Sequence, residues 1–202
     1  MPPRFIARQL SYPRGLAGYV VAKLMNRHNA KMNTFAVQQL ELTTADRVLE
    51  IGFGGGVALP TLIAQAGRIS GVDRSSDVVR RAKTRFSDAV KSGRLDLREG
   101  NVEALPFEGG KFEKVYTANT IYFWRSLDRG FAEIHRVLAP NGRAVIAFLP
   151  KERMDARGFP PDIFTSRAPE DVIAALTRAH FKDIRIERPA PTTAWNVVVA
   201  TR

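Results

Sequence analysis

The fold of this chain is decided by one stretch, Val48-Leu49-Glu50-Ile51-Gly52-Phe53-Gly54-Gly55-Gly56. Its first half is typical of a short buried strand, and its second half is a glycine loop that follows an acidic residue. A second run, Ile69-Ser70-Gly71-Val72-Asp73, predicts another strand that ends in a carboxylate. Glycines let a ligand approach the backbone, and a carboxylate on the neighbouring strand can accept hydrogen bonds from both hydroxyls of a ribose. Together the two runs predict a site for an adenosine-containing cofactor.

The glycine spacing distinguishes between the cofactors that such a site can bind. A dinucleotide site requires Gly-x-Gly-x-x-Gly, but the glycines here are Gly52, Gly54 and Gly56, and Val57 stands where the third glycine of that motif would fall. In addition, the charge of Glu50 would repel a diphosphate and attract a cationic α-amino group. The loop therefore favours a ligand with an ammonium group and no phosphates, such as S-adenosylmethionine (SAM). A nicotinamide-dependent oxidoreductase is the least favoured alternative.

Two further blocks extend this pattern along the chain. The third block is Glu99–Phe107, and the fourth is Glu133–Arg143, which runs directly into the apolar stretch Ala144–Phe148. With four blocks in this order, the chain resembles the class I SAM-dependent methyltransferases from about Leu42 to its C-terminus. The resemblance implies SAM as the cofactor. It also implies a Rossmann-like α/β fold, in which a doubly wound seven-stranded sheet has an antiparallel last strand.

The apolar patterns themselves alternate between strand and helix. Strands are predicted at residues 47–51, 69–73, 95–99, 114–118 and 143–148, and helices from about residue 58, at 76–91, at 127–138 and from 169 onward. This alternation predicts a doubly wound sheet. Two late strands, at 183–188 and 195–201, have no helix between them and so place an antiparallel strand in the sheet. Residues 150–167 are expected to be irregular.

Composition limits the classes to which the protein can belong. The 202 residues, 45% of them hydrophobic, are enough for one domain with a full core. The absence of Cys excludes disulfides, thiolate metal sites and a thiol nucleophile. No apolar segment follows Arg4 and Arg8 as in a secretory signal, so we expect a cytoplasmic protein. The net charge of +11 suggests an anionic partner, either an anionic membrane surface at the periphery or nucleic acid, or simply basic solvated faces.

The N-terminal segment, residues 1–40, is predicted to form a basic amphipathic helical arm before the SAM-binding domain at residues 41–202. Leu16, Val20 and Leu24 recur every four residues, as on one face of a helix. The first acidic residue of the chain is Glu41. We expect this arm to serve as a lid that supplies part of the acceptor pocket, or to contact a membrane or nucleic acid.

Ligands of open α/β sheets bind beyond the carboxyl ends of the strands, so the residues that follow each strand are the candidates. The resemblance implies that Glu50, with the backbone of Gly52 and Gly54, holds the methionine part of SAM. Asp73 is expected to bind the ribose hydroxyls, although it could instead cap the helix that follows. Arg74 is expected to cover the adenine face.

Later blocks supply the remaining candidates. Asn101 stands where the family usually has Asp, and its amide oxygen could accept the same hydrogen bond from the adenine amino group, with the backbone of Val102 beside it. The alternative for Asn101 is a turn residue. Asn119 and Tyr122 follow the fourth strand, nearest the sulfonium, and are the candidates for positioning the reacting groups. Tyr122 could equally be a core residue, or its ring could attract the sulfonium.

The sequence has no Ser-His-Asp set and no evident metal cluster. Methyl transfer from a sulfonium does not require a base, because alignment and water exclusion can lower much of the barrier. We therefore expect a SAM-dependent methyltransferase that acts on a small-molecule or lipid-like acceptor. The alternatives are an RNA methyltransferase, which the charge favours, and a SAM-binding protein without catalysis.

Overall fold

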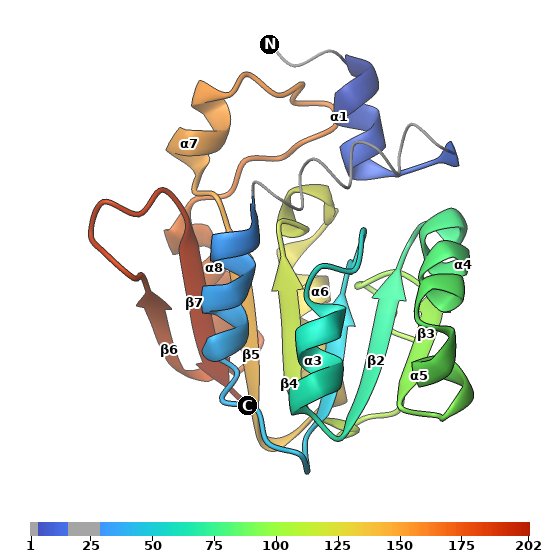
Figure 1. The fold of residues 1–202 in the computed structure, drawn as a ribbon. Coiled ribbons are helices and arrows are strands. Elements are labelled where there is room, and N and C mark those ends of the chain that lie inside the picture. The colour runs from blue at the N-terminus through green and yellow to red at the C-terminus, as the bar shows by residue number, and fades with distance from the viewer. Residues whose placement is uncertain (1–3, 16–28) are drawn as a thin grey trace.

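The computed structural model describes residues 4–15 and 29–202, and these build a seven-stranded sheet in the order β3-β2-β1-β4-β5-β7-β6 (Figure 1). The strands are β1 Arg47–Ile51, β2 Arg68–Asp73, β3 Leu95–Glu99, β4 Phe112–Ala118, β5 Leu138–Phe148, β6 Lys182–Glu187 and β7 Asn196–Thr201. The pairs from β3 to β5 are parallel, whereas β7 is antiparallel to both β5 and β6. The predicted doubly wound sheet with an antiparallel last strand is therefore confirmed.

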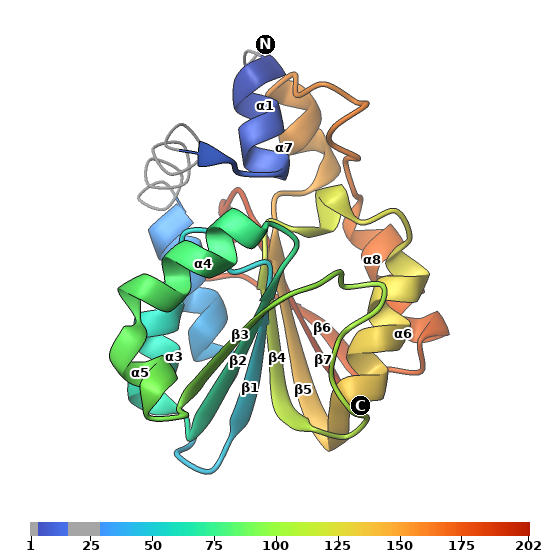
Figure 2. The ribbon, with the colours of Figure 1, turned by 90° about the vertical axis from the view of Figure 1, so that its right-hand side faces the viewer.

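Helices cover both faces of this sheet. One face carries the helical residues 29–38 with α3 and α4, and the other carries α6 and α8 (Figure 2). The helices are α1 Arg4–Ser11, α3 Leu59–Gln65, α4 Ser76–Arg85, α5 Ser87–Lys91, α6 Leu127–Val137, α7 Lys151–Ala156 and α8 Pro169–Arg178, with a 3₁₀ turn at Ile121–Phe123. Among the described residues, no helix has both the length and the apolar character needed to cross a membrane.

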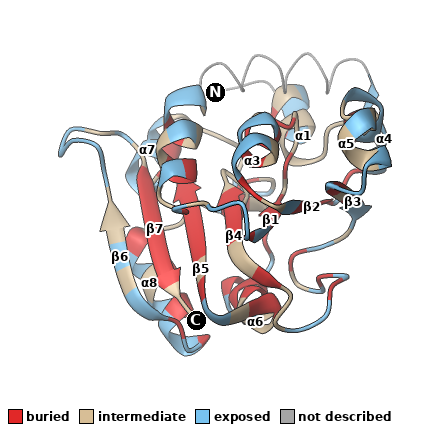
Figure 3. Cartoon of the chain, turned by 60° about the horizontal axis from the view of Figure 1, so that its bottom comes forward, coloured by how far each residue is buried: buried red, intermediate tan, exposed pale blue. Residues whose placement is uncertain are grey.

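The strand side chains alternate between two cores because successive residues of a strand point to opposite faces. Val48 packs in the core under α3, while Leu49 packs in the core under α6 and α8. The central strands are buried on both faces, and β6, at the edge, is more exposed (Figure 3). Glu50 shares the face of Val48, so its carboxylate lies on the side of the helical segment 29–38.

Two predicted elements differ from the structure for local reasons. The helix predicted at 76–91 is two helices, because the chain leaves helical geometry at Phe86 (φ −111°, ψ 33°), whose ring packs beside Gly56. The segment 150–167, predicted to be irregular, contains the short helix α7. An ion pair of 2.7 Å between Lys151 and Asp155, one turn apart, supports that helix.

The fifth strand is longer than the predicted range 143–148. It begins at Leu138, because Leu138 pairs with Phe112 at the start of β4. The register of this pair then shifts around Asn141 (φ 61°). The preceding helix accordingly ends at Val137. Pro140 and Gly142 are residue types typical of turns, so the sequence pattern favours a turn at 140–142, whereas the structure includes these residues in β5.

Helix α1, in the described part of the N-terminal segment, lies over the carboxyl ends of the parallel strands. Helix α7 also lies above this edge of the sheet in both ribbon views (Figures 1 and 2). Ala7 of α1 is fully buried in the core, and Arg4 forms an exposed 2.5 Å ion pair with Asp162. The predicted periodicity at Leu16, Val20 and Leu24 lies outside the described residues.

Candidate active site

The glycine loop begins where β1 ends, and its first glycine fills a position that no other residue fits. Gly52 has φ 69°, and a Cβ there would overlap Cγ2 of Thr120. The amide of Gly52 donates to the carbonyl oxygen of Val72 at 2.7 Å, which ties the loop to β2. The Thr120 hydroxyl in turn lies 2.5 Å from that of Thr117, which donates to the carbonyl oxygen of Ile51. The first turn of the loop is thus fixed from three strands.

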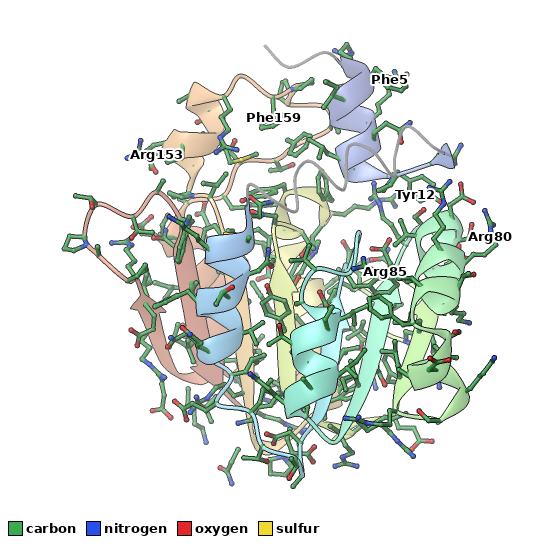
Figure 4. All side chains as sticks on the ribbon, viewed as in Figure 1. Phe5, Tyr12, Arg80, Arg85, Arg153 and Phe159 are labelled. Carbon is green, nitrogen blue, oxygen red and sulfur yellow. The ribbon has the colours of Figure 1, made fainter. Side chains whose placement is uncertain are left out.

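The rest of the loop is held by α4 and by the end of β2. Gly54 (φ 48°) donates its amide to Oδ2 of Asp73 at 2.9 Å. Arg85, near the end of α4, donates to the carbonyl oxygen of Gly55 at 2.9 Å, and Figure 4 shows its side chain reaching toward the loop. Gly52 and Gly54 therefore line the cavity with their backbone fixed.

Glu50 presents a buried carboxylate that lacks a partner. Its exposed fraction is 4%, and its Oε2 has no hydrogen bond within the described part of the chain. Burial, together with the negative charge of Asp73, raises the pKa of Glu50 to about 8. An orphaned carboxylate of this kind is costly unless a cation or donor reaches it. The site therefore fits the ammonium group of a SAM methionine tail.

Two residues that the sequence did not point to surround this carboxylate. Tyr116 stands beside Glu50 in the β1–β4 register, is fully buried, and donates its hydroxyl hydrogen to Oδ1 of Asn33. Asn33 also donates to the carbonyl oxygen of Asn29 at 2.9 Å, and both asparagines line the cavity. Segment 29–38 thus contributes polar groups to the part of the cavity that holds Glu50.

Asp73 lines the cavity and does not cap α4, because the N-cap of that helix is Ser75. Its Oδ1 accepts the amide hydrogen of Ser75 at 2.9 Å, and its Oδ2 accepts that of Gly54. Burial raises the pKa of Asp73, although these hydrogen bonds oppose the shift. A carboxylate has about four lone-pair sites, so two accepted bonds leave capacity for ribose hydroxyls.

Arg74 lies at the same cavity, but its guanidinium is bound to the N-terminal arm. Nε donates to the carbonyl oxygen of Ser11 at 2.9 Å, and a terminal nitrogen donates to the Ser11 hydroxyl at 2.6 Å. The guanidinium also lies 5.4 Å from the ring centroid of Tyr12 and 5.7 Å from that of Phe123. Arg74 therefore joins the arm to the end of β2, a role that the sequence did not indicate.

Asn101 is a turn residue at the rim of the cavity. Its Oδ1 accepts the amide hydrogen of Glu103 at 3.1 Å, and its side chain is exposed, whereas Val102 beside it is 6% exposed. Glu103 then accepts the amide hydrogens of Arg125 and Ser126, which fixes the wall of the cavity. The turn role of Asn101 does not prevent a second hydrogen bond to its amide, because one lone pair and both N–H donors stay available.

Asn119 and Tyr122 form a connected pair after β4. Asn119 has φ 56°, a conformation that Asn tolerates, and its Oδ1 lies 3.2 Å from the Tyr122 hydroxyl. That hydroxyl accepts the Leu149 amide hydrogen at 2.5 Å. Burial raises the pKa of Tyr122 well above its usual value. Burial therefore favours the protonated form of the Tyr122 hydroxyl, which is held by its contacts with Asn119 and Leu149.

Two adjoining cavities meet at this point. One is lined by Asp73, Arg74, Asn101 and Val102, and the other by Glu50, Tyr122 and a group of apolar side chains. Both share the lining residues Leu10, Pro13, Gly52, Gly54, Ala118, Asn119 and Phe123. The described residues contain no group of three His, Cys, Asp or Glu side chains that could hold a metal ion.

The second cavity has an aromatic wall opposite the glycine loop. Phe159 stacks on Phe164 with ring centroids 4.4 Å apart, and Phe123 meets Phe164 edge-on at 4.7 Å. Leu10, Leu149 and Met154 complete the apolar lining. These side chains come from α1, from the segment 149–164 and from the turn after β4, so the wall exists only in the folded chain.

Comparison with known proteins agrees with this geometry. The Methyltransferase domain family model matches residues 49–146. The chain is 30% identical over 184 residues to the ubiquinone/menaquinone biosynthesis C-methyltransferase UbiE of Geobacter sp. (strain M21), a match that covers 75% of this chain and 77% of that protein. The chain belongs to the class I SAM-dependent methyltransferases.

Other methyltransferases are similar over most of their length. The methyltransferase YdaC of Bacillus subtilis (strain 168) is 29% identical over 174 residues, which cover 85% of this chain and 89% of YdaC. A SAM-dependent methyltransferase from Mesorhizobium loti shares the fold, with a TM-score of 0.70 and 18% identity, over 84% of this chain and 96% of that one. This methyltransferase accordingly uses SAM as its cofactor and transfers its methyl group.

Proposed function

We propose that this methyltransferase transfers the methyl group of SAM to a small or lipid-like, largely apolar acceptor. The observation that carries the proposal is the pair of cavities that meet at Gly52, Ala118 and Asn119. One cavity has the polar residues that an adenosine requires, and the other has an aromatic wall suited to an apolar acceptor. Their meeting point is where a sulfonium methyl would face an acceptor atom.

The proposed cofactor contacts follow from the polar groups of the site. Glu50 pairs with the ammonium group, because its Oε2 lacks a partner. The backbone of Gly52 and Gly54 lies against the methionine tail, and Asp73 accepts from the ribose hydroxyls. Arg74, Asn101 and Val102 border the adenine, since they line the first cavity.

The remaining residues act by positioning and exclusion of water. SAM, when bound, supplies a methyl group on a sulfonium, a strong leaving group. Asn119 and Tyr122 hold the wall beside that position, and Tyr122 is kept rigid by its bonds to Leu149. Leu10 and Phe159 exclude water from the acceptor side. Alignment of this kind can account for much of a displacement reaction's acceleration.

We further propose that residues 4–15 act as a lid and, for a lipid-like acceptor, as a contact with anionic membranes. Leu10 and Pro13 line the acceptor cavity. Phe5 is 58% exposed and stands between Arg4 and Arg8 on α1, at the outer end of the molecule (Figure 4). An exposed aromatic side chain among cations suits an anionic lipid surface.

Transfer of radiolabelled methyl from SAM to a panel of acceptors tests this function. The panel should contain apolar ring compounds, isoprenoid lipids, and tRNA and rRNA as the alternative acceptors. We expect labelled product from apolar compounds and none from RNA. Labelling confined to RNA would overturn the proposal, as would SAM binding without transfer to any member. Flotation with anionic and neutral liposomes tests the membrane contact, and Phe5→Ser should weaken binding to anionic liposomes.

A further inference from the structure

One cation lies in the acceptor cavity without a partner among the described residues. Arg157 follows α7 and lines this cavity together with Met154 and Phe159. In the described part of the chain its guanidinium forms no ion pair within 4.0 Å and no side-chain hydrogen bond. Other arginines here are bound to carboxylates, as in the pairs of Arg47 with Glu113 and of Arg136 with Glu133.

The carboxylates of the same segment are already bound elsewhere. Asp155 accepts from Lys151 at 2.7 Å and from Ser166 at 2.6 Å, and Asp162 pairs with Arg4. Arg157 and Tyr122 line the same cavity, and the charge of Arg157 lowers the pKa of Tyr122 against the larger effect of burial.

The cavity thus has three chemically distinct parts. Glu50 and Asn33 form an acidic and polar side, Phe159 and Phe164 form an aromatic wall, and Arg157 supplies a positive charge on the acceptor side. A half-buried guanidinium beside apolar walls binds oxyanions well, because it presents several donors in a fixed plane and little water competes.

We infer that Arg157 binds an oxyanion group of the acceptor, so that the substrate class is an apolar, ring-containing molecule with one carboxylate, sulfonate or phosphate. The inference rests on the proposed function, since it places that acceptor in the cavity next to SAM. Phe159 and Phe164 contact the ring, and Arg157 fixes the end that carries the charge. The uncharged part then carries the atom that is methylated, next to Asn119.

Two fluorescent probes with nearly the same aromatic ring system distinguish the effect of a negative charge on binding from the effect of apolar contact. These are 1-anilinonaphthalene-8-sulfonate, an anion, and N-phenyl-1-naphthylamine, which is neutral. Their affinities are measured on the full chain with saturating S-adenosylhomocysteine. We expect Arg157→Gln to weaken binding of the anionic probe about tenfold and to change binding of the neutral probe less than about twofold. Arg157→Lys should keep part of the anion affinity.

Control variants distinguish a failure of the inference on Arg157 from a failure of the proposed acceptor cavity. Arg153→Gln removes an exposed arginine of α7, which does not line the cavity and points outward in Figure 4, and should leave both affinities unchanged. Phe159→Ala should weaken both probes. Equal affinity of wild type and Arg157→Gln for the anionic probe would overturn the inference on Arg157 and leave the proposed function standing. Failure of both probes to bind wild type would overturn the proposed acceptor cavity as well. Displacement by 1-naphthoate and 1-naphthyl phosphate then distinguishes a carboxylate from a phosphate.

Discussion

The carboxylates of Glu50 and Asp73 lie buried near the ends of adjacent strands, and the charge of Asp73 raises the pKa of Glu50. Asp73 has two backbone donors, from Gly54 and Ser75, while Oε2 of Glu50 has no partner in the described chain. The two acids therefore differ in what they require from a ligand. Asp73 can accept hydrogen bonds from hydroxyl groups, whereas Glu50 needs a positive charge.

This difference predicts a pH dependence of cofactor binding. Glu50, with a pKa near 8, must lose its proton to pair with an ammonium group. The affinity for S-adenosylhomocysteine should therefore rise about tenfold per pH unit from pH 6 to about 7.5. It should fall again at higher pH, where the α-amino group of S-adenosylhomocysteine loses its charge. Calorimetry in buffers of different ionisation enthalpy should show release of about one proton near pH 7.

Glu50→Gln supplies the control for this titration. The variant should bind S-adenosylhomocysteine more weakly at pH 8, and its affinity should no longer rise between pH 6 and 7.5. A rise as steep as that of the wild type would show that another group titrates.

The same raised pKa predicts that the ligand-free protein loses stability as pH rises. Between the unfolded pKa of 4.5 and the folded value of about 8, the folded chain holds a proton on Glu50 that the unfolded chain has lost. The free energy of unfolding should then fall by about 1.4 kcal/mol per pH unit from this group. Urea unfolding of wild type and Glu50→Gln should diverge between pH 5 and 7.5, with the variant increasingly the more stable. Parallel curves would contradict this prediction.

Gly52→Ala should weaken cofactor binding through a steric effect on the loop. Both Gly52 and Gly110 have φ 69°, but a Cβ at Gly110 meets no atom within 4 Å, whereas one at Gly52 overlaps Thr120. Each substitution should cost about 1–2 kcal/mol of stability from backbone strain. Only Gly52→Ala should also weaken S-adenosylhomocysteine binding, by at least about tenfold. Thr120→Ser removes the obstructing methyl group and should restore part of the affinity in the double variant.

Tyr122→Phe should reduce stability without changing the pH–rate profile. Loss of the hydroxyl leaves the buried Leu149 amide without its acceptor, at a cost of about 1–3 kcal/mol. Urea unfolding measures this loss. Because the pKa of Tyr122 is raised, its proton is not removed during turnover and the profile of kcat against pH should keep its shape. Tyr12→Phe is the control, since the Tyr12 hydroxyl forms no hydrogen bond with described residues. A shifted profile would assign Tyr122 a proton-transfer role.

Removal of residues 1–15 should abolish turnover while the sheet still folds. Leu10 and Pro13 would no longer close the acceptor cavity, and Arg74 would lose its contacts with Ser11. Circular dichroism should show a folded protein, and kcat should fall at least about a hundredfold, the scale of a lost positioning element. Arg4→Gln removes only the exposed pair with Asp162 and should leave kcat nearly unchanged. Full turnover by the truncated chain would remove the lid proposal.

The sequence predicted what depends on local patterns. The order of strands and helices follows from apolar periodicity, and the placement of Glu50, Gly54 and Asp73 at one edge follows from their positions at strand ends. These features need no knowledge of distant contacts.

Other features depend on contacts between segments far apart in the chain. Arg74 meets Ser11, Tyr116 meets Asn33, and Arg157 enters the cavity only because the segment after β5 turns back over the sheet. No local period or turn signal marks such a contact. The break at Phe86 was missed for the same reason, since its ring packs against the glycine loop 30 residues earlier.

The turn at residues 73–75 contacts both the proposed cofactor site and the N-terminal residues 4–15. Ser75 donates its amide hydrogen to Asp73 and its hydroxyl hydrogen to the carbonyl oxygen of Pro13 at 2.7 Å. The same turn therefore joins the proposed ribose position to Pro13, which lines both cavities. We expect a compulsory kinetic order, in which SAM enters an open enzyme first, the acceptor follows, and S-adenosylhomocysteine departs last.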